Sequence, residues 1–218
     1  MKIIHKDEWL LAVDKPAGLP TLPTPEGQEE TLAAKIAQQF PKQKEIPDCG
    51  IVHRLDNDTS GIVLIAKSTE VYQKLRDMWN TDAVKKTYLA VVLGKLKGTG
   101  TIDTPIAHHP SKKKKMVPDK KEGRPAATHW KSKKIIGDYT LLEVAITTGV
   151  RHQIRIHLAS IGHPLAGDAL YQQTKHQSQN PKGLNHHLLH LSQLVLPHPT
   201  KEKVSLVIQS DPPFPNLR

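Results

Sequence analysis

Residues 51–67 have the sequence IVHRLDNDTSGIVLIAK, which combines a polar loop with an apolar strand. Their second half, GIVLIA at residues 61–66, is a continuous apolar run of strand length, which predicts a buried strand. In front of this strand, Arg54 and Asp56 lie two positions apart in a polar loop. Catalytic side chains are typically carried by loops that a rigid apolar scaffold holds in place. An ordinary turn with an ion pair would use the same residue types, so this segment alone leaves both interpretations open.

The residues that follow Asp56 predict how the loop is shaped. Thr59 and Ser60 can hydrogen-bond the loop backbone, and Gly61 permits a sharp return into the strand. Asp58, beside Thr59, is expected to brace the turn through the backbone rather than to take part in chemistry.

Hydrophobic spacing elsewhere predicts many strands and a few helices. Helices are predicted where apolar residues recur every three or four positions, at residues 31–40, at residues 68–79, and after Gly149 as far as Gly162. The Gly98-Thr99-Gly100 stretch is predicted to be a turn. Because strands and helices do not alternate, the fold class is predicted as α+β, with a mixed, largely antiparallel sheet and flanking helices and loops. The predicted strands are residues 9–14, 61–66, 88–93, 128–136, 139–147, 188–196 and 204–208.

The length and the cysteine content set the broad class of the protein. A chain of 218 residues is long enough for one domain or for two closely packed lobes. Its single cysteine, Cys49, excludes an internal disulfide and fits a reducing compartment, and we interpret it as a small buried residue. No apolar run is long enough to cross a membrane, and the first residues lack the pattern of a signal peptide. We therefore expect a cytoplasmic protein with one domain over residues 1–218.

The charge makes a polyanion the first partner to consider. The chain has 31 Lys+Arg against 21 Asp+Glu, a formal net charge of +10, and phosphates attract clustered positive side chains. A lysine run is also common in solvated loops, so composition alone does not establish a nucleic-acid partner. The positive charge peaks in the run Lys112, Lys113, Lys114 and Lys115.

The histidines do not form a recognisable metal site. His152 and His157 lie five positions apart, and His186, His187 and His190 cluster near one another, but no Asp or Glu accompanies either group at ligand spacing. We therefore expect no metal. A metal-dependent hydrolase stays as a distant alternative, which would require bound metal.

Several segments together resemble the RluA-type pseudouridine synthases. HRLDNDTSG, which begins at His53, is similar to the signature of that family, and VDKPAG at residues 13–18 is similar to its amino-terminal motif. KTYLAVVLG at residues 86–94 resembles the strand that carries the active-site tyrosine. TGVRHQIRIH at residues 148–157, followed by GHPLAGDALY at residues 162–171, resembles the third motif. The motifs follow the order of the family over nearly the whole chain.

This resemblance implies a function and a set of site residues. It implies an enzyme that isomerises specific uridines of ribosomal or transfer RNA to pseudouridine, without a cofactor, in the central cleft of the pseudouridine synthase catalytic fold. Asp56 would be the catalytic carboxylate, Tyr88 the ring that stacks on the base, and Arg155 the ion-pair partner of the carboxylate. Arg54 and Arg151 would bind substrate, although Val150 departs from the polar residue usual in the family and leaves the role of Arg151 open. The four lysines are expected to bind substrate phosphates because of their charge. The alternative is a non-catalytic RNA-binding protein on the same fold.

The resemblance also implies how the RNA is bound. Only about twelve residues precede the first motif, so no amino-terminal S4-type RNA-binding domain is expected, and a monomeric catalytic domain would bind an RNA stem-loop with a flipped uridine. A helix after Gly149 would place Arg151 and Arg155 one turn apart on one face. One arginine could then meet the carboxylate while the other reaches a phosphate.

The chemistry needs a carboxylate and no redox partner. Pseudouridine forms when the N1–C1′ bond breaks, the uracil turns, and C5 joins C1′. A carboxylate could act on the sugar as a nucleophile, or as a base through a glycal-type route, and the sequence leaves both routes open.

Overall fold

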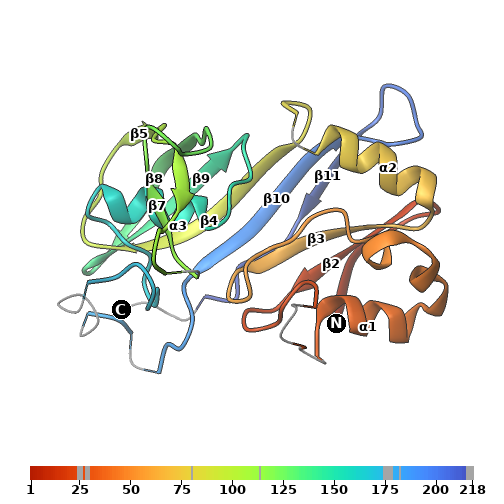
Figure 1. Cartoon of the computed structure of the whole chain (residues 1–218), viewed down its shortest axis with the longest axis horizontal. Helices are drawn as coiled ribbons and strands as arrows, with labels where there is room; N and C mark the ends of the chain where they lie inside the picture. The colour runs from red at the N-terminus through yellow and green to blue at the C-terminus, as the bar shows by residue number, and fades with distance from the viewer. Residues whose placement is uncertain are drawn as a thin grey trace. The chain divides into compact units, whose positions relative to one another are not determined.

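The computed structural model describes residues 1–23, 27, 30–79, 81–112, 114–173, 179–181 and 183–214 (Figure 1). The chain divides into two compact units, which are treated separately below. Unit 1 consists of Met1–Lys86 and Leu191–Pro212, and unit 2 consists of Thr87–His190 and Pro213–Arg218. The chain leaves unit 1 within strand β4 and returns to it within strand β10.

The core of unit 1 is a set of neighbouring strands in the order β1-β2-β3-β10, with β11 paired to β10. The pairs β1–β2, β2–β3 and β10–β11 are antiparallel. All seven residues of β3 are buried, which confirms the strand predicted from the GIVLIA run. These strands are β1 (Lys2–Lys6), β2 (Leu10–Lys15), β3 (Ser60–Ala66), β10 (Leu189–Pro197) and β11 (Ser205–Gln209).

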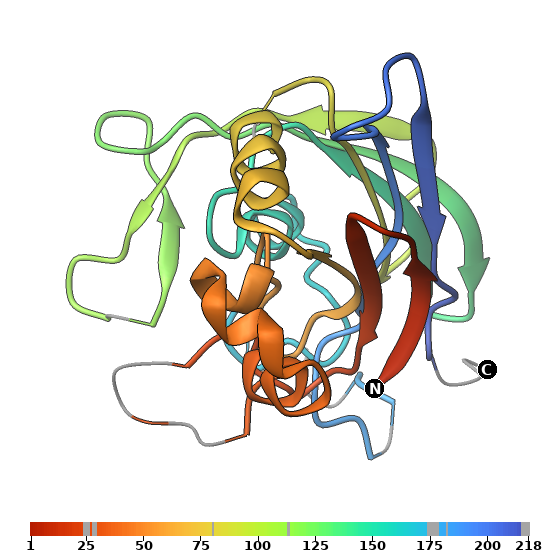
Figure 2. The same cartoon turned by 90° about the vertical axis from the view of Figure 1, so that its right-hand side faces the viewer.

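Two helices, α1 (Leu32–Gln39) and α2 (Thr69–Met78), lie on the same side of β1 and β2 in Figure 2. Each begins at a capping side chain: Thr31 accepts a hydrogen bond from the backbone N–H of Ala34, and Ser68 accepts one from Val71. Such caps satisfy donors that the first helical turn leaves unpaired. The predictions of both helices from spacing and capping residues are confirmed.

Cys49 does not occupy the buried position expected for it. It lies half-exposed in the second of two short 3₁₀ segments, η1 (Pro41–Glu45) and η2 (Pro47–Gly50). Asp48 and Cys49 both have positive φ, 52° and 54°, so the chain turns in the left-handed region there. This irregular turn, which brings a small side chain to the surface, has no periodic signal in the sequence.

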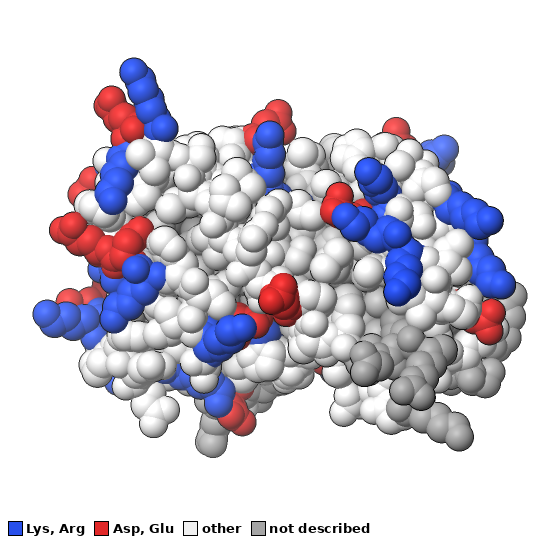
Figure 3. Space-filling view, turned by 180° about the vertical axis from the view of Figure 1, so that it is seen from behind, with Lys and Arg blue, Asp and Glu red and all other residues white. Residues whose placement is uncertain are grey.

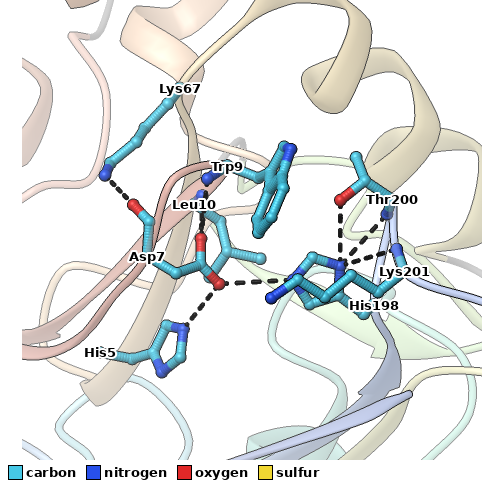
Figure 4. Close-up of polar contacts among 8 residues, drawn as sticks. All are labelled: His5, Asp7, Trp9, Leu10, Lys67, His198, Thr200 and Lys201. Carbon is cyan, nitrogen blue, oxygen red and sulfur yellow. Dashed lines mark hydrogen bonds and ion pairs between the residues drawn. The ribbon is translucent and has the colours of Figure 1, made fainter.

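A polar cluster ties the β1–β2 turn of unit 1 to the end of β10 (Figure 4). One carboxylate oxygen of Asp7 accepts the backbone N–H groups of Trp9 and Leu10, both at 2.8 Å. The other lies 3.4 Å from Nε2 of His198. Nδ1 of His198 accepts the backbone N–H of Lys201 at 3.1 Å, so the proton of the neutral ring belongs on Nε2, facing Asp7.

The strands of unit 2 follow the order β4-β9-β8-β5, and β6 pairs with β7 in a separate two-stranded sheet. The β8–β9 hairpin turns at Gly137 and Asp138, as predicted. One further helix, α3 (Gln153–Ser160), follows β9, and Gly162 has a φ of +84° just beyond its end. The strands are β4 (Lys85–Leu93), β5 (Thr99–Ile102), β6 (Ile106–His108), β7 (Met116–Pro118), β8 (Thr128–Ile136) and β9 (Tyr139–Ile146).

The prediction of a turn at residues 98–100 is wrong in part, because β5 begins at Thr99. Gly100 pairs with Trp130 of β8, and a Cβ atom at position 100 would lie 2.7 Å from the indole. The glycine therefore makes room for a large neighbouring ring. A sequence rule that treats glycine as a turn signal cannot see this cross-strand contact.

The strand pairs β1–β2, β2–β3, β10–β11, β5–β8, β6–β7 and β8–β9 are antiparallel, in keeping with the predicted fold class. Among the described residues, no helix is long and apolar enough to cross a membrane.

Candidate active site

The loop that carries Asp56 is fixed in unit 1 by backbone hydrogen bonds at both ends. The N–H of Val52 donates to the carbonyl of Leu64 in β3 at 2.9 Å. In the middle, the hydroxyl of Thr21 accepts the N–H of Leu55 at 3.2 Å and donates to its carbonyl at 2.9 Å. The N–H of Thr59 donates to the carbonyl of Asp56 at 3.1 Å and closes the turn. The loop thus presents a half-buried Asp56 from a fixed backbone.

His53 connects the loop to strand β3. Its ring is buried and stacks on Trp79, with centroids 4.0 Å apart and planes 11° apart. Nε2 accepts the backbone N–H of Leu64 at 3.2 Å. Burial, and then the positive charges of Lys86 and Arg76, lower the pKa of His53 to about 3. The ring is therefore neutral near pH 7 and serves as a hydrogen-bond acceptor.

Lys15 is a fully buried lysine at the end of β2. Its ammonium donates to the backbone carbonyls of Pro16 at 3.0 Å, Leu19 at 2.6 Å and Asn57 at 2.9 Å. Asn57 directly follows Asp56, so this one side chain joins the turn after β2 to the loop. Lys15 lies in the VDKPAG segment, whose sequence does not indicate this role.

The charge of Lys15 interacts with both carboxylates of the loop. Burial lowers the pKa of Lys15 to about 8, while Asp56 and then Asp58 act to raise it. The two carboxylates therefore favour the charged form of the Lys15 ammonium and partly offset its burial. The prediction that the side chain of Asp58 braces the turn is wrong, because this side chain makes no hydrogen bond to another described residue. Its charge interacts with that of Lys15.

Gly61 allows the loop to enter β3 next to another strand. Its φ is +117°, and a Cβ atom there would collide with the carbonyl oxygen of Leu191 in β10. Any side chain would push the two backbones apart. The expectation that Gly61 permits the sharp return into the strand is confirmed.

In unit 2, Arg155 of α3 forms a buried, two-point ion pair with Asp168. Nε lies 2.7 Å from Oδ2 and Nη2 lies 2.9 Å from Oδ1. Burial acts to raise the pKa of Asp168, but the hydrogen bond and charge of Arg155 outweigh it and lower the pKa. Asp168 was not a predicted site residue, although it lies in the last matched motif. The pairing of Arg155 with Asp56 would join the two units and stays a prediction.

The prediction that Arg151 and Arg155 share a helix face is wrong. Helix α3 begins at Gln153, and the residue before it, His152, has a φ of 58° in the left-handed region. The side-chain oxygen of Gln153 accepts the N–H of Val150 at 3.2 Å, which folds the preceding residues into a turn. Arg151 therefore lies exposed in that turn.

The remaining predicted site residues are distributed as follows. Arg54 is exposed on the Asp56 loop of unit 1. Tyr88 lies in β4 of unit 2 with 8% of its surface exposed. Lys112 and Lys114 are exposed and Lys115 is half-buried. These three residues lie in the loop between β6 and β7, as predicted, and Lys113 lies outside the described residues.

The histidines and carboxylates of the described part of the chain form no group of three that could hold a metal ion. His157 uses both ring nitrogens within the fold: Nδ1 pairs with the hydroxyl of Thr128 and Nε2 with the carbonyl of Thr104, each at 2.8 Å. Its role is therefore structural.

The aspartate loop of unit 1, and the tyrosine strand and arginine helix of unit 2, are the elements that the resemblance to the RluA-type synthases leads us to expect. The model of the RNA pseudouridylate synthase family matches residues 9–160. The chain belongs to this family, and its resemblance to the RluA-type synthases is confirmed.

Individual relatives agree with this assignment. The chain is 39% identical over 209 residues to ribosomal large subunit pseudouridine synthase D of Nitrosomonas europaea, covering 94% of this chain and 60% of that protein. It is 36% identical over 221 residues to the uncharacterized RNA pseudouridine synthase YhcT of Bacillus subtilis, covering 99% and 69%. The chain spans about half to two thirds of the length of the curated relatives it matches.

A solved structure shows the same fold. Human RNA pseudouridylate synthase domain containing 1 superposes with a TM-score of 0.78 at 22% sequence identity, covering 98% of this chain and 84% of that one. The predicted α+β class is confirmed by this likeness.

Proposed function

We propose that the protein is an RNA pseudouridine synthase that isomerises specific uridines of ribosomal RNA, with Asp56 as the catalytic carboxylate. The observation that carries the proposal is the position of Asp56 in a loop fixed by Thr21, His53 and Lys15, in a chain that belongs to this family. The names of relatives that act on the ribosomal large subunit favour ribosomal over transfer RNA.

The fixed loop suits the reaction chemically. Whether Asp56 attacks the sugar or removes a proton from it, the ionised carboxylate has to meet C1′ or its neighbour in one orientation. The positive charge of the Lys15 ammonium interacts favourably with the carboxylate of Asp56. We propose that Arg155 pairs with Asp56 and that the ring of Tyr88 stacks on the uracil, with its hydroxyl near C5, where a proton leaves.

The RNA would be bound by exposed positive side chains. Arg54, Arg151, Lys112 and Lys114 are exposed and can reach phosphates, which is the sequence-independent part of RNA binding. On the face drawn in Figure 3, lysine and arginine side chains form several separate groups with acidic side chains among them.

The oligomeric state, the cofactor requirement and the cellular compartment are part of the same proposal. We infer a monomer that works without a cofactor in the cytoplasm. A single cysteine, Cys49, fits such a reducing compartment.

The test of the proposed function compares two neighbouring carboxylates. Asp56→Asn keeps the size of the side chain but removes the charge that both candidate routes require, so pseudouridine formation should fall by orders of magnitude while RNA affinity and folding are retained. Asp58→Asn should lose at most about 2 kcal/mol of stability and keep most of the activity. Tritium release from C5-labelled RNA, with thermal melts of all three proteins, provides the measurement.

Substantial turnover by Asp56→Asn would overturn the assignment. If the wild-type protein binds RNA but releases no tritium from ribosomal or transfer RNA, the alternative of a non-catalytic RNA-binding protein applies. Mapping of pseudouridines in cells with and without the gene identifies the substrate positions.

A further inference from the structure

The hydroxyl of Tyr171 joins strand β7 to the start of helix α3 within unit 2. Its oxygen accepts the backbone N–H of Met116 at 3.0 Å and lies 2.8 Å from Nδ1 of His152. A hydroxyl has one proton to donate and can accept two, so it can serve both partners at once. Met116 directly follows Lys115, the last residue of the lysine run. One atom thus links the base of that loop to the residue that precedes α3.

The ring of the same tyrosine contacts two cations. The guanidinium carbon of Arg155 lies 5.1 Å from the ring centroid, and the ammonium of Lys115 lies 5.7 Å from it. Both distances are within the range of a favourable cation–π interaction. The backbone N–H of Tyr171 donates to Asp168 at 3.2 Å, and Asp168 also holds Arg155. The position of Arg155 is therefore fixed by Tyr171 and by the carboxylate that Tyr171 helps to orient.

The backbone of His152 has a conformation that non-glycine residues rarely adopt. Its φ of 58° is unfavourable for a residue with a Cβ atom and persists where the surroundings fix it. Its ring meets Tyr171 edge-on, with centroids 5.7 Å apart and planes 80° apart, in addition to the hydrogen bond. Removal of the hydroxyl would remove this hydrogen bond to the residue that precedes α3.

We propose that Tyr171 is a positioning residue that holds Lys115 and Arg155 in one arrangement, so that RNA contact by the lysine loop and the orientation of Arg155 are coupled. This inference rests on the proposed function, because it gives Arg155 a role in the isomerisation. None of the predicted roles included Tyr171.

The first experiment measures RNA affinity and does not require turnover. Lys115→Ala, Tyr171→Leu and the double variant are compared by filter binding to a ribosomal RNA fragment. If Tyr171 holds Lys115 in its RNA-binding position, each single change lowers the affinity for RNA. The affinity of the double variant should then be at most about twofold lower than that of the single variant that binds RNA less tightly. Thermal melts establish that each variant is folded.

The second experiment measures the rate of the chemical step. Tyr171→Phe keeps the ring and its packing but removes the hydroxyl, so it should slow single-turnover pseudouridine formation at saturating RNA by about 10- to 100-fold, with RNA affinity within about twofold of wild type. Tyr139→Phe is the matched control, because its hydroxyl bonds only the carbonyl of Gln179 among the described residues. This control should react at the wild-type rate.

Two results would overturn the inference: strictly multiplicative losses of affinity in the double variant, or equal rates for Tyr171→Phe and Tyr139→Phe in a protein that turns over. A wild-type protein that binds RNA without forming pseudouridine would instead count against the proposed function alone, since the affinity measurements still decide whether Tyr171 and Lys115 are coupled.

Discussion

The backbone around Asp56 is held in place by three polar side chains. Thr21 binds the backbone on both sides of Leu55, His53 accepts a hydrogen bond from β3, and Lys15 binds the carbonyl of the residue after Asp56. Each uses a different polar group, but all of them bind the backbone. A catalytic group on a short loop needs such support, because small displacements reduce the rate strongly.

The sequence indicates Asp56 more clearly than it indicates the residues that support its loop. Asp56 lies within a recognisable motif, whereas Lys15 has its partner Asn57 forty-two positions away and Arg155 has Asp168 thirteen positions away. Neither pair leaves a periodic pattern in the sequence. The left-handed conformation of His152 is equally invisible, because it depends on a hydrogen bond to a tyrosine in a later segment.

The carboxylate of Asp7 provides a prediction about acid stability. Burial acts to raise its pKa, but hydrogen bonds from Leu10, His5, Trp9 and His198 outweigh burial and lower the pKa to about 2. Because the pKa is lower in the folded than in the unfolded chain, the stabilisation is complete above about pH 4 and is lost as the pH falls towards 2. Asp7→Asn should therefore cost about 1–2 kcal/mol at pH 7, and less at pH 2.5. Urea unfolding at both pH values measures the difference.

The control for this prediction is Asp82→Asn, which changes an exposed carboxylate in the same unit. It should leave the unfolding free energy nearly unchanged at both pH values. A loss for Asp7→Asn that is the same at pH 7 and pH 2.5 would show that the carboxylate charge is not the stabilising feature.

At the level of elements, the turn after β2 and the Asp56 loop behave as one piece because Lys15 binds both. Replacement of Lys15 by methionine preserves the apolar stem but leaves three carbonyls without their donor. We expect a loss of at least about 2 kcal/mol in the free energy of unfolding, since unpaired buried acceptors are costly. Thermal and urea unfolding of the purified variant test this expectation.

Lys67→Met is a matched comparison, because Lys67 in the same unit is half-buried and donates to a single carbonyl, that of Asp7. Its loss should be clearly smaller than that of Lys15→Met. Equal losses would mean that the number of carbonyls bound by Lys15 does not matter.

Most elements were predictable where the local sequence contains its own signals. Helices α1 and α2 begin at capping residues with regular apolar spacing, and β3 is a continuous apolar run. Helix α3 begins later than expected because the side chain of Gln153 binds the turn before it. Strand β1 was missed because its residues are largely exposed, and β6 and β7 because each has only three residues. These elements are set by contacts with other segments.

For the whole molecule, the net charge of +10 makes RNA binding sensitive to salt. Changing Lys112, Lys113, Lys114 and Lys115 to alanine should weaken binding across RNA sequences. The slope of log affinity against log salt should decrease by about 0.7–0.9 for each phosphate group that the variant no longer binds. Filter binding over a range of salt concentrations provides the measurement.

A second variant separates local contacts from total charge. Changing four exposed lysines of unit 1, Lys2, Lys42, Lys44 and Lys85, to alanine gives the same net charge of +6. The salt slope of this control should stay closer to that of the wild type. If the two variants have the same slope, the lysine run contributes only to the total charge.

At this scale, the sequence predicted the fold class and the family but not the division of the chain into two units. The segments of unit 1 come from both sides of unit 2, and their pairing depends on β10 lying beside β3. Apolar runs indicate that both are strands, but they contain no information about which strand is the neighbour. Only a contact such as Gly61 against Leu191 reveals it.

The same division has a consequence for protein synthesis. β3 leaves the ribosome long before β10, because about 100 residues of unit 2 lie between the two parts of unit 1. Because β3 ends at Ala66 and β10 begins at Leu189, at about 5–20 residues per second the uncovered edge of β3 waits roughly 6–25 s for its partner strand. An apolar strand with an open edge is a template for wrong pairing. The nascent chain is therefore most exposed to aggregation in this interval, and β3 is the segment that a chaperone acting during translation would protect.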